Sequence, residues 1–161
     1  MFVLLRAAVY SVVFIGFLLV FLPARILAGS GITVPPLGPQ QVLGAAITAA
    51  GAALALSCIL TFVRLGRGTP APFDPPRKLV VRGPYTYVRN PMYLGAAAAL
   101  LGAAIYYGSW VLAGYALAFL LSMAAFARLY EEPTLRRTFG AEYEEYCSRV
   151  GRWLPLWPPR P

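Results

Sequence analysis

The stretch YLGAAAALLGAAIYYGSWVLAGYALAFLLSMAAFA, residues 93–127, decides the fold because it contains no charged residue. A helix needs about 20 apolar residues to cross a bilayer, so this stretch is too long for one crossing and slightly short for two. Gly108-Ser109, near its middle, is a turn signal, and the aromatic residues around it suit a membrane interface. We therefore expect a tight hairpin of two membrane helices, over about residues 92–107 and 110–128.

Two further apolar runs precede this hairpin. The first covers about residues 2–22 and is closed by Pro23, with Arg6 close enough to its end for the guanidinium to reach the surface. The second covers about residues 42–63 and is rich in glycine and alanine. Because small residues let helices approach closely in lipid, we expect this second helix at the centre of a bundle. The alternative is that its small face joins two copies of the chain into an oligomer.

The basic residues give the expected topology. Segment 64–92 holds six Lys and Arg residues, and the tail from residue 128 onward holds six more, whereas the loop 23–41 holds only Arg25. Basic residues mark the cytoplasmic side of a membrane. The sequence therefore predicts an all-α integral membrane protein, multi-pass, with four transmembrane helices and both termini in the cytoplasm. Residues 1–161 form one domain in this interpretation.

The composition excludes several kinds of chemistry. The chain is 59% hydrophobic and 12% charged, has a net charge of +8, and contains no histidine and only two cysteines. A Ser-His-Asp triad and a His-ligated or four-cysteine metal site are therefore excluded, and we expect no metal. Membrane insertion accounts for the basic excess, so the expected partner is the lipid bilayer and not a nucleic acid.

The first polar segment leads into a helix start at Asn90-Pro91. Asn is among the best N-cap residues, and Pro is favoured at the first helical position. The end of the helix would present free N–H groups and favour an anion such as a carboxylate, and Arg89 adds a full positive charge. The alternative is that Arg89 binds lipid phosphate while Asn90 only caps the helix.

The second polar segment begins with the adjacent acids Glu131 and Glu132. Neighbouring side chains point about 100° apart on a helix, so the two cannot do the same job. Arg128 lies within reach of either, and the alternative interpretation is an ordinary surface ion pair at a solvated helix end. Further on, the acids and tyrosines of residues 142–146 predict a C-terminal interfacial amphipathic helix with a solvated acidic face.

Two motifs in these segments carry a family resemblance. The run RGPYTYVRNPMYLG, residues 82–95, and the run EEPTLRRTFGAEYEEYCSRV, residues 131–150, flank the expected hairpin. Together they resemble the signature of the isoprenylcysteine carboxyl methyltransferase family, which is related to the phospholipid N-methyltransferases. The matching residues, in order, are Gly83, Tyr85, Arg89, Pro91, Tyr93, Gly95, Glu131, Glu132, Leu135, Phe139, Gly140, Tyr143 and Tyr146. The resemblance covers about residues 64–155.

The resemblance implies S-adenosylmethionine as methyl donor, held in a cofactor pocket at the cytoplasmic membrane surface. Carried over by position, the contacting residues would be Lys78, Leu79, Val80, Tyr85, Asn90, Pro91, Met92, Tyr93 and Glu131, with Arg89 beside them. The chemistry is suitable, since the cofactor's carboxylate fits a helix N-terminus, its ammonium needs an acid such as Glu131, and its adenine and sulfonium fit aromatic walls. Asn90 departs from the family, which usually has a histidine there, and it cannot act as a base.

The expected reaction follows from this cofactor. Family members use an arginine just before the Glu-Glu pair to orient the acceptor, and Arg128 is the nearest one. A carboxylate acceptor needs no general base and could pair with Arg128, whereas an amine acceptor would have to lose a proton, for which Glu132 is the candidate base. We expect carboxyl O-methylation of a lipophilic acceptor. The alternatives are phospholipid or amine N-methylation, an NADPH-dependent membrane reductase of the sterol-reductase type, and a non-enzymatic small four-span protein.

Overall fold

The computed structural model describes residues 13, 16–62, 64 and 78–156. Its elements are a π-helical segment Gly16–Phe21, α2 Leu22–Gly29, α3 Pro39–Thr61, a 3-10 turn Gly83–Thr86, α4 Pro91–Tyr107, α5 Trp110–Phe126, a second π-helical segment Ala127–Glu131, α6 Glu132–Phe139 and α7 Ala141–Arg149. Within these described residues no strand forms, and the only bridge joins Val88 to Gly151. The predicted all-α class is therefore confirmed.

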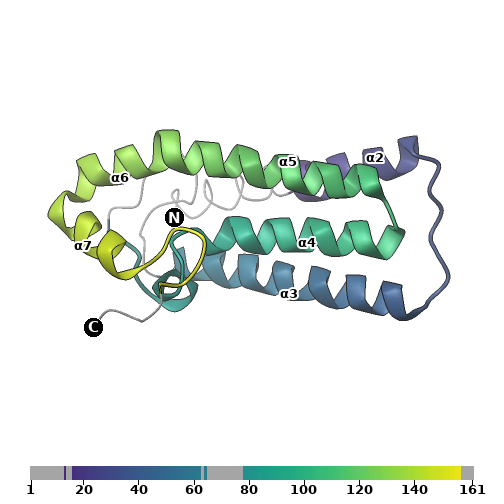
Figure 1. Ribbon diagram of the computed structural model, residues 1–161, viewed down its shortest axis with the longest axis horizontal. Helices are drawn as coiled ribbons and strands as arrows, with labels where there is room; N and C mark the ends of the chain where they lie inside the picture. The colour runs from purple at the N-terminus through teal and green to yellow at the C-terminus, as the bar shows by residue number, and fades with distance from the viewer. Residues whose placement is uncertain (1–12, 14–15, 63, 65–77, 157–161) are drawn as a thin grey trace.

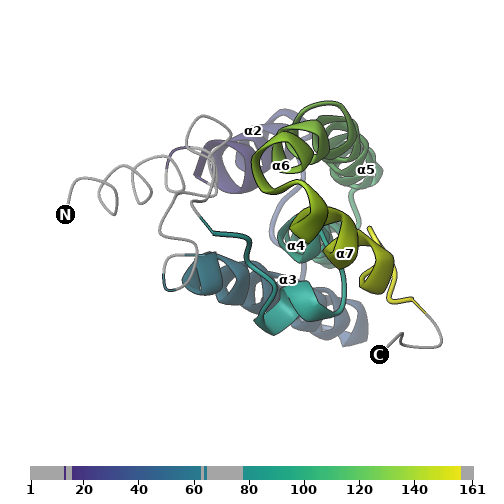
Figure 2. The same ribbon diagram turned by 90° about the vertical axis from the view of Figure 1, so that its left-hand side faces the viewer.

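The three long helices α3, α4 and α5 lie side by side along the length of the molecule (Figure 1). An end-on view places α4 between the other two (Figure 2). At one end α6 continues the line of α5, and α7 turns back across the start of α4. Near the other end α2 lies against α5, and the Tyr115 hydroxyl donates a hydrogen bond of 2.7 Å to the carbonyl of Leu18 in the π-helical segment before α2.

The predicted hairpin between α4 and α5 is confirmed, with its turn at Gly108-Ser109. Gly108 has a φ of 61°, a left-handed conformation that glycine adopts without strain and that commonly ends a helix. The Ser109 hydroxyl accepts a hydrogen bond of 3.2 Å from the Leu112 N–H and so caps α5. The turn predicted from the sequence therefore forms through the left-handed conformation of Gly108 and the side-chain cap by Ser109.

Four glycines bring the backbones of α3 and α4 together. Gly44 and Gly51 on α3 face Gly95 and Gly102 on α4, and in each helix the two glycines are about two turns apart. A Cβ atom on Gly51 would lie only 2.5 Å from the backbone nitrogen of Ala99. The two helices can therefore lie this close only because these positions have no side chain.

The expectation that this small-residue helix lies at the centre of the bundle is wrong. The buried residues of α3 all lie on one face, at Gly44, Gly51 and Cys58. By contrast, α4 is buried on two faces, because Ala96 and Leu100 also pack against α5. A narrow small-residue face fixes how closely a helix can approach one neighbour, but a central helix needs a second apolar face against another.

Two prolines lie inside helices that continue past them. Pro23 closes the first apolar run of the sequence but does not end the helix, because α2 runs through it to Gly29. The helix of α5 likewise does not end near residue 128 but continues through Pro133 to Phe139. Each proline lies two residues after a π-helical segment. A wider π turn relieves the clash between a proline ring and the preceding turn, which explains why neither proline ends its helix.

The outer surface supports a membrane protein. Two helices in the described residues are long and apolar enough to cross a bilayer, Pro39–Thr61 and Trp110–Phe139. At 17 residues α4 is about 25 Å long, slightly less than a typical hydrocarbon core. Large apolar side chains such as Leu43, Leu60, Leu117 and Leu121 are exposed along α3 and α5. Most of the first predicted span lies outside the described residues, so the number of spans stays a prediction, as does the single domain over 1–161.

Candidate functional site

Residues 78–90 and the residues that follow α5 meet at the end of the molecule where α4 begins (Figure 1). The tail after α7 returns beside residues 88–90, and the helix that continues α5 carries both members of the Glu-Glu pair past the same place. As expected for adjacent helical positions, the two acids point into different surroundings. Glu131 joins a tyrosine group, defined as Tyr85, Tyr93 and Glu131, and Glu132 joins an arginine group, defined as Arg89, Glu132 and Arg152.

The tyrosine group is largely enclosed by protein. The Tyr93 hydroxyl donates a hydrogen bond of 2.6 Å to Oε1 of Glu131, and the exposed fractions of Tyr85 and Tyr93 are 7% and 8%. Tyr85 packs with Cys58 and Val80, and the Phe62 ring meets it edge-on with centroids 5.4 Å apart. One carboxylate thus lies among aromatic rings next to the start of α4.

Glu131 lies beyond the apolar part of the long helix, since the charged residue Arg128 already precedes it. Desolvation raises the pKa of the Glu131 carboxyl above its ordinary value, and the nearby charge of Glu132 raises it further, whereas the hydrogen bond from Tyr93 lowers it. Burial likewise raises the pKa of the Tyr85 hydroxyl. Glu131 is therefore a carboxylate whose negative charge is not matched by a cation within its own group, and a cationic ligand would stabilise it.

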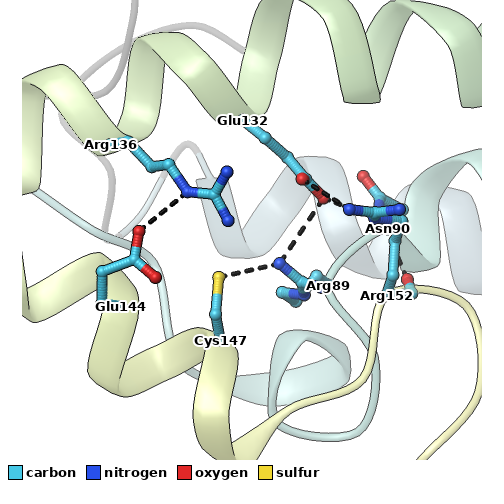
Figure 3. Close-up of polar contacts among 7 residues, drawn as sticks. All are labelled: Arg89, Asn90, Glu132, Arg136, Glu144, Cys147 and Arg152. Atoms are coloured by element: carbon cyan, nitrogen blue, oxygen red, sulfur yellow. Dashed lines mark hydrogen bonds and ion pairs between the residues drawn. The ribbon is translucent and has the colours of Figure 1, made fainter.

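The arginine group neutralises the other acid (Figure 3). Glu132 is 4% exposed, and Arg152 donates to both of its oxygens, with distances of 2.6 and 2.7 Å. Arg89 lies 3.5 Å from Oε1 of Glu132 and donates to Sγ of Cys147 at 2.7 Å. Two-point pairing of a guanidinium with a carboxylate fixes the orientation of both groups, so Glu132 is held rigidly.

The tail also contacts the residues just before α4. Val88 forms a bridge with Gly151, and the Arg89 N–H donates to the Gly151 carbonyl at 2.8 Å. The side chain of Asn90 donates to the Arg152 carbonyl at 3.3 Å and makes no capping hydrogen bond (Figure 3). The helix does begin at Pro91 as predicted, but the expected side-chain cap by Asn90 is wrong, because the returning tail draws its amide away from the helix.

The C-terminal helix α7 is amphipathic, but its tyrosine face is not turned toward lipid. Tyr143 and Tyr146 are buried with Val150, and Leu79 and Leu135 pack against them. The Tyr146 hydroxyl donates to the Tyr85 carbonyl at 2.8 Å. The predicted solvated acidic face is confirmed, because Glu142, Glu144 and Glu145 are exposed, whereas the tyrosines pack inside the protein and hold segment 79–85 in place. The position of this helix at the membrane interface stays a prediction.

The predicted site residues are only partly brought together. Val80 and Met92 pack with Tyr85, whereas Leu79 belongs to the cluster under α7. Lys78 and Arg128 are exposed, and within the described residues neither forms an ion pair. The sequence interpretation missed Arg152, which lies outside both motifs. A lone arginine in a tail carries no spacing signal, and its importance depends on where the tail returns.

The residues at this end fit S-adenosylmethionine chemically. Glu131 offers a largely enclosed carboxylate that accepts a hydrogen bond from a neutral phenol, and such a group suits the cofactor's ammonium. Tyr85 and Tyr93 provide aromatic surface, and the start of α4 at Pro91 provides the positive end of a helix dipole. A cofactor pocket as such stays a prediction.

One of the comparisons with known proteins finds a family for this chain. A family model described as phospholipid methyltransferase matches residues 39–142, from the start of α3 to the start of α7. No curated protein and no solved structure matches the chain. The matched family includes isoprenylcysteine carboxyl methyltransferase-like proteins, so the resemblance predicted from the two motifs is confirmed. Because the match covers well over half of the chain, the protein belongs to the phospholipid methyltransferase family.

Proposed function

We propose that this protein is an S-adenosylmethionine-dependent membrane methyltransferase that methylates the carboxylate of a lipophilic acceptor. The observation that carries the choice of acceptor is the state of the two acids at the site. Glu131 is hydrogen-bonded to Tyr93, Glu132 is paired with two arginines, and the chain has no histidine. A carboxylate is already nucleophilic, so it is the acceptor that can react without a free base.

The cofactor, when bound, supplies a methyl group on a positively charged sulfur that is open to in-line attack. In our proposal Glu131 binds its ammonium group, and Tyr93 holds the Glu131 carboxylate in position through the 2.6 Å hydrogen bond. The start of α4 at Asn90 and Pro91 binds its carboxylate. Because positioning supplies most of the rate of such a displacement, these residues act by alignment.

Arg128 is the proposed contact for the acceptor. It lies where the apolar part of the long helix ends, and both it and the neighbouring Leu129 are exposed. A guanidinium at this level could pair with an acceptor carboxylate while the lipophilic part of the acceptor stays beside Leu129 and the bilayer. Entry of the acceptor sideways from the membrane follows from this arrangement.

Glu132 has a positioning role in this proposal. As a general base it would have to take up a proton, but its two oxygens accept hydrogen bonds from Arg152, and Arg89 adds a second positive charge. Both oxygens are thus already engaged in a two-point pair with a guanidinium, which holds them away from an incoming acceptor. We therefore assign Glu132 the role of holding Arg152 and Arg89 in position, and no role in proton transfer.

The proposed topology has four spans with both termini in the cytoplasm, so that the polar end lies at the cytoplasmic surface. The distribution of Lys and Arg supports it. The proposed partners are the bilayer and the lipophilic acceptor, with no nucleic acid. A second copy of the chain would have to pack on another face than the glycines of α3, because α4 already covers them.

The direct test is methylation of membrane extracts with S-adenosylmethionine carrying a labelled methyl group. We expect the label in a lipid-extractable product, and we expect mild alkali to release it as methanol because methyl esters hydrolyse and N-methyl groups do not. Label that alkali does not release as methanol, but that stays on a head-group amine, would instead support N-methylation of a phospholipid, the reaction that the description of the matched family favours. No transfer to any lipid, together with no binding of S-adenosylhomocysteine by calorimetry, would overturn the proposed function.

A reductase or a transporter would differ from a methyltransferase in what stabilises it and in where its charges lie. A reductase of the sterol-reductase type would be stabilised against thermal unfolding by NADPH, and a methyltransferase by S-adenosylhomocysteine. A four-span transporter would be expected to carry a charged residue inside a span, but α3, α4 and α5 contain none. Family membership adds to the case for the methyltransferase.

A further inference from the structure

Glu131 and the tyrosine that orients it lie on two separate elements. Glu131 itself lies on the helix that continues α5, and its hydrogen-bond donor Tyr93 lies in the first turn of α4. The contact between them forms only if these elements keep a fixed relative position. The packing of α4 against α5 sets this position along the apolar part of the two helices, and a contact near residues 131–132 would set it at the polar end.

Arg152 makes that connection with two different parts of one residue. Its carbonyl accepts a hydrogen bond from the side chain of Asn90, immediately before α4. Its guanidinium donates to both oxygens of Glu132, the neighbour of Glu131 (Figure 3). A single tail residue thus joins the two elements that carry the Glu131–Tyr93 contact.

The surrounding backbone supports the same connection. Gly151 forms the bridge with Val88 and accepts the Arg89 N–H at 2.8 Å, so the position of the Arg152 backbone is fixed next to Asn90. Arg152 also lies beyond the range that the family model matches. Its assignment therefore comes from the contacts of this chain and not from the family match.

We infer that Arg152 is a positioning residue for cofactor binding, which acts by holding Glu132 and Asn90 so that Glu131 keeps its orientation. The inference rests on the proposed function, because Glu131 is taken to bind the ammonium group of the cofactor. It also gives Asn90 a role, since its amide donates to the Arg152 carbonyl at the position where the family usually has a histidine. The tail after α7 is then part of the cofactor site.

The test is a double-mutant cycle with S-adenosylhomocysteine as the probe and calorimetry as the readout. In the wild-type background, we expect Arg152→Met to weaken binding about 10- to 100-fold, because misplacing a positioned group by an ångström has effects of this size. In a Glu131→Gln background the same substitution should change affinity less than about threefold, because the group that Arg152 positions has lost its charge. An equal loss in both backgrounds would mean that Arg152 acts independently of Glu131, through Asn90 or through the fold as a whole, and would overturn the inference.

Two further variants keep the test decisive. If Arg152→Met does not fold, Arg152→Lys replaces it in the cycle, because Lys keeps the charge beside Glu132 but cannot make the two-point contact. Arg136→Met is the matched control, since Arg136 pairs with Glu144 on the exposed surface, and we expect no change in affinity. Wild-type protein that binds no S-adenosylhomocysteine would overturn the proposed function and the inference together. If only the inference fails, the wild-type protein will bind S-adenosylhomocysteine, and the effects of the Arg152 and Glu131 substitutions on affinity will be additive.

Discussion

The contact between α3 and α4 and the polar end of the molecule are held together in opposite ways. Along α3 and α4, the glycine positions bring two backbones together through the absence of side chains. At the polar end, a few long side chains reach across between elements and pair in fixed geometry. The contact between α3 and α4 is therefore sensitive to added side-chain atoms, and the polar end is sensitive to the loss of a charged group. Substitutions in the two regions should therefore differ in the property that they change, stability or ligand affinity, as well as in the size of that change.

The largest effect is expected from Gly51→Leu. The Cβ alone would lie 2.5 Å from the Gly95 carbonyl oxygen and from the Ala99 nitrogen, both of which are backbone atoms that cannot rotate away. The helices would have to separate, so we expect destabilisation of about 3 kcal/mol or more and little folded protein in detergent. Thermal unfolding and size-exclusion chromatography measure it.

The matched control for this substitution is Gly114→Leu on α5. A Cβ at Gly114 meets nothing within 4 Å, so the same added side chain should leave the unfolding temperature nearly unchanged. If the two variants unfolded alike, the glycines of α3 would not be what brings the helices together.

The next effect is expected at the arginine group. Glu132→Gln keeps the shape of the side chain but leaves the facing Arg152 and Arg89 without their counter-charge. Removing one partner of a mostly buried ion pair destabilises by about 3 kcal/mol, which denaturant unfolding would show as a lower midpoint with an unchanged slope.

The control for Glu132→Gln is Glu144→Gln, which breaks an ion pair whose two side chains are half exposed. Exposed pairs contribute little, so its midpoint should stay at the wild-type value. Equal shifts for the two variants would contradict the distinction between a buried and a surface pair.

The sequence predicts much of the apolar region because its signals are local. A turn at Gly108-Ser109 and a helix start at Pro91 follow from the conformations that these residues prefer, and both occur. The continuation of helices through Pro23 and Pro133 could not be predicted, because it depends on π turns in the preceding residues. The position of α4 between α3 and α5 depends on the combined packing of all three helices.

The candidate site was predictable only as far as its motifs extend. The spacing of Glu131 and Glu132 correctly predicts that the two diverge, but the partner of each is decided by long-range contacts. Arg128 is close to both in sequence and pairs with neither, whereas Arg152 reaches Glu132 because the tail returns past residues 88–90. Local sequence does not determine where a tail returns.

A third prediction contrasts the two neighbouring acids directly. Glu131→Gln should weaken the binding of S-adenosylhomocysteine about 10- to 100-fold, since a hydrogen-bonded charge pair is worth about 1.5–3 kcal/mol. It should leave the unfolding midpoint close to that of the wild type, because within the described residues Glu131 forms no ion pair that the substitution would break. Calorimetry and thermal unfolding on the same preparation measure both quantities. Unchanged affinity would reject Glu131 as the ammonium partner.

The smallest effect concerns the proton on Glu131. Because burial raises the pKa of this carboxyl, part of it is protonated at a pH where an exposed glutamate is fully charged. The ammonium group of S-adenosylhomocysteine stays protonated between about pH 5 and 7 and binds the charged form, so affinity should rise with pH until Glu131 is fully ionised. Tyr93→Phe removes the 2.6 Å hydrogen bond that lowers this pKa, so the rise should move to higher pH, in addition to the overall loss of affinity expected when Glu131 loses the contact that positions it.

Calorimetric titrations at several pH values measure this shift. The control is Tyr115→Phe, which removes a tyrosine hydroxyl at the far end of α5 and should leave the pH profile where it is. A profile that Tyr93→Phe also leaves in place would mean that the hydrogen bond does not tune the carboxylate. The protonation of Glu131 would then be set by its burial and by the neighbouring charge of Glu132, and the tyrosine group would differ from the arginine group only in lacking a cation.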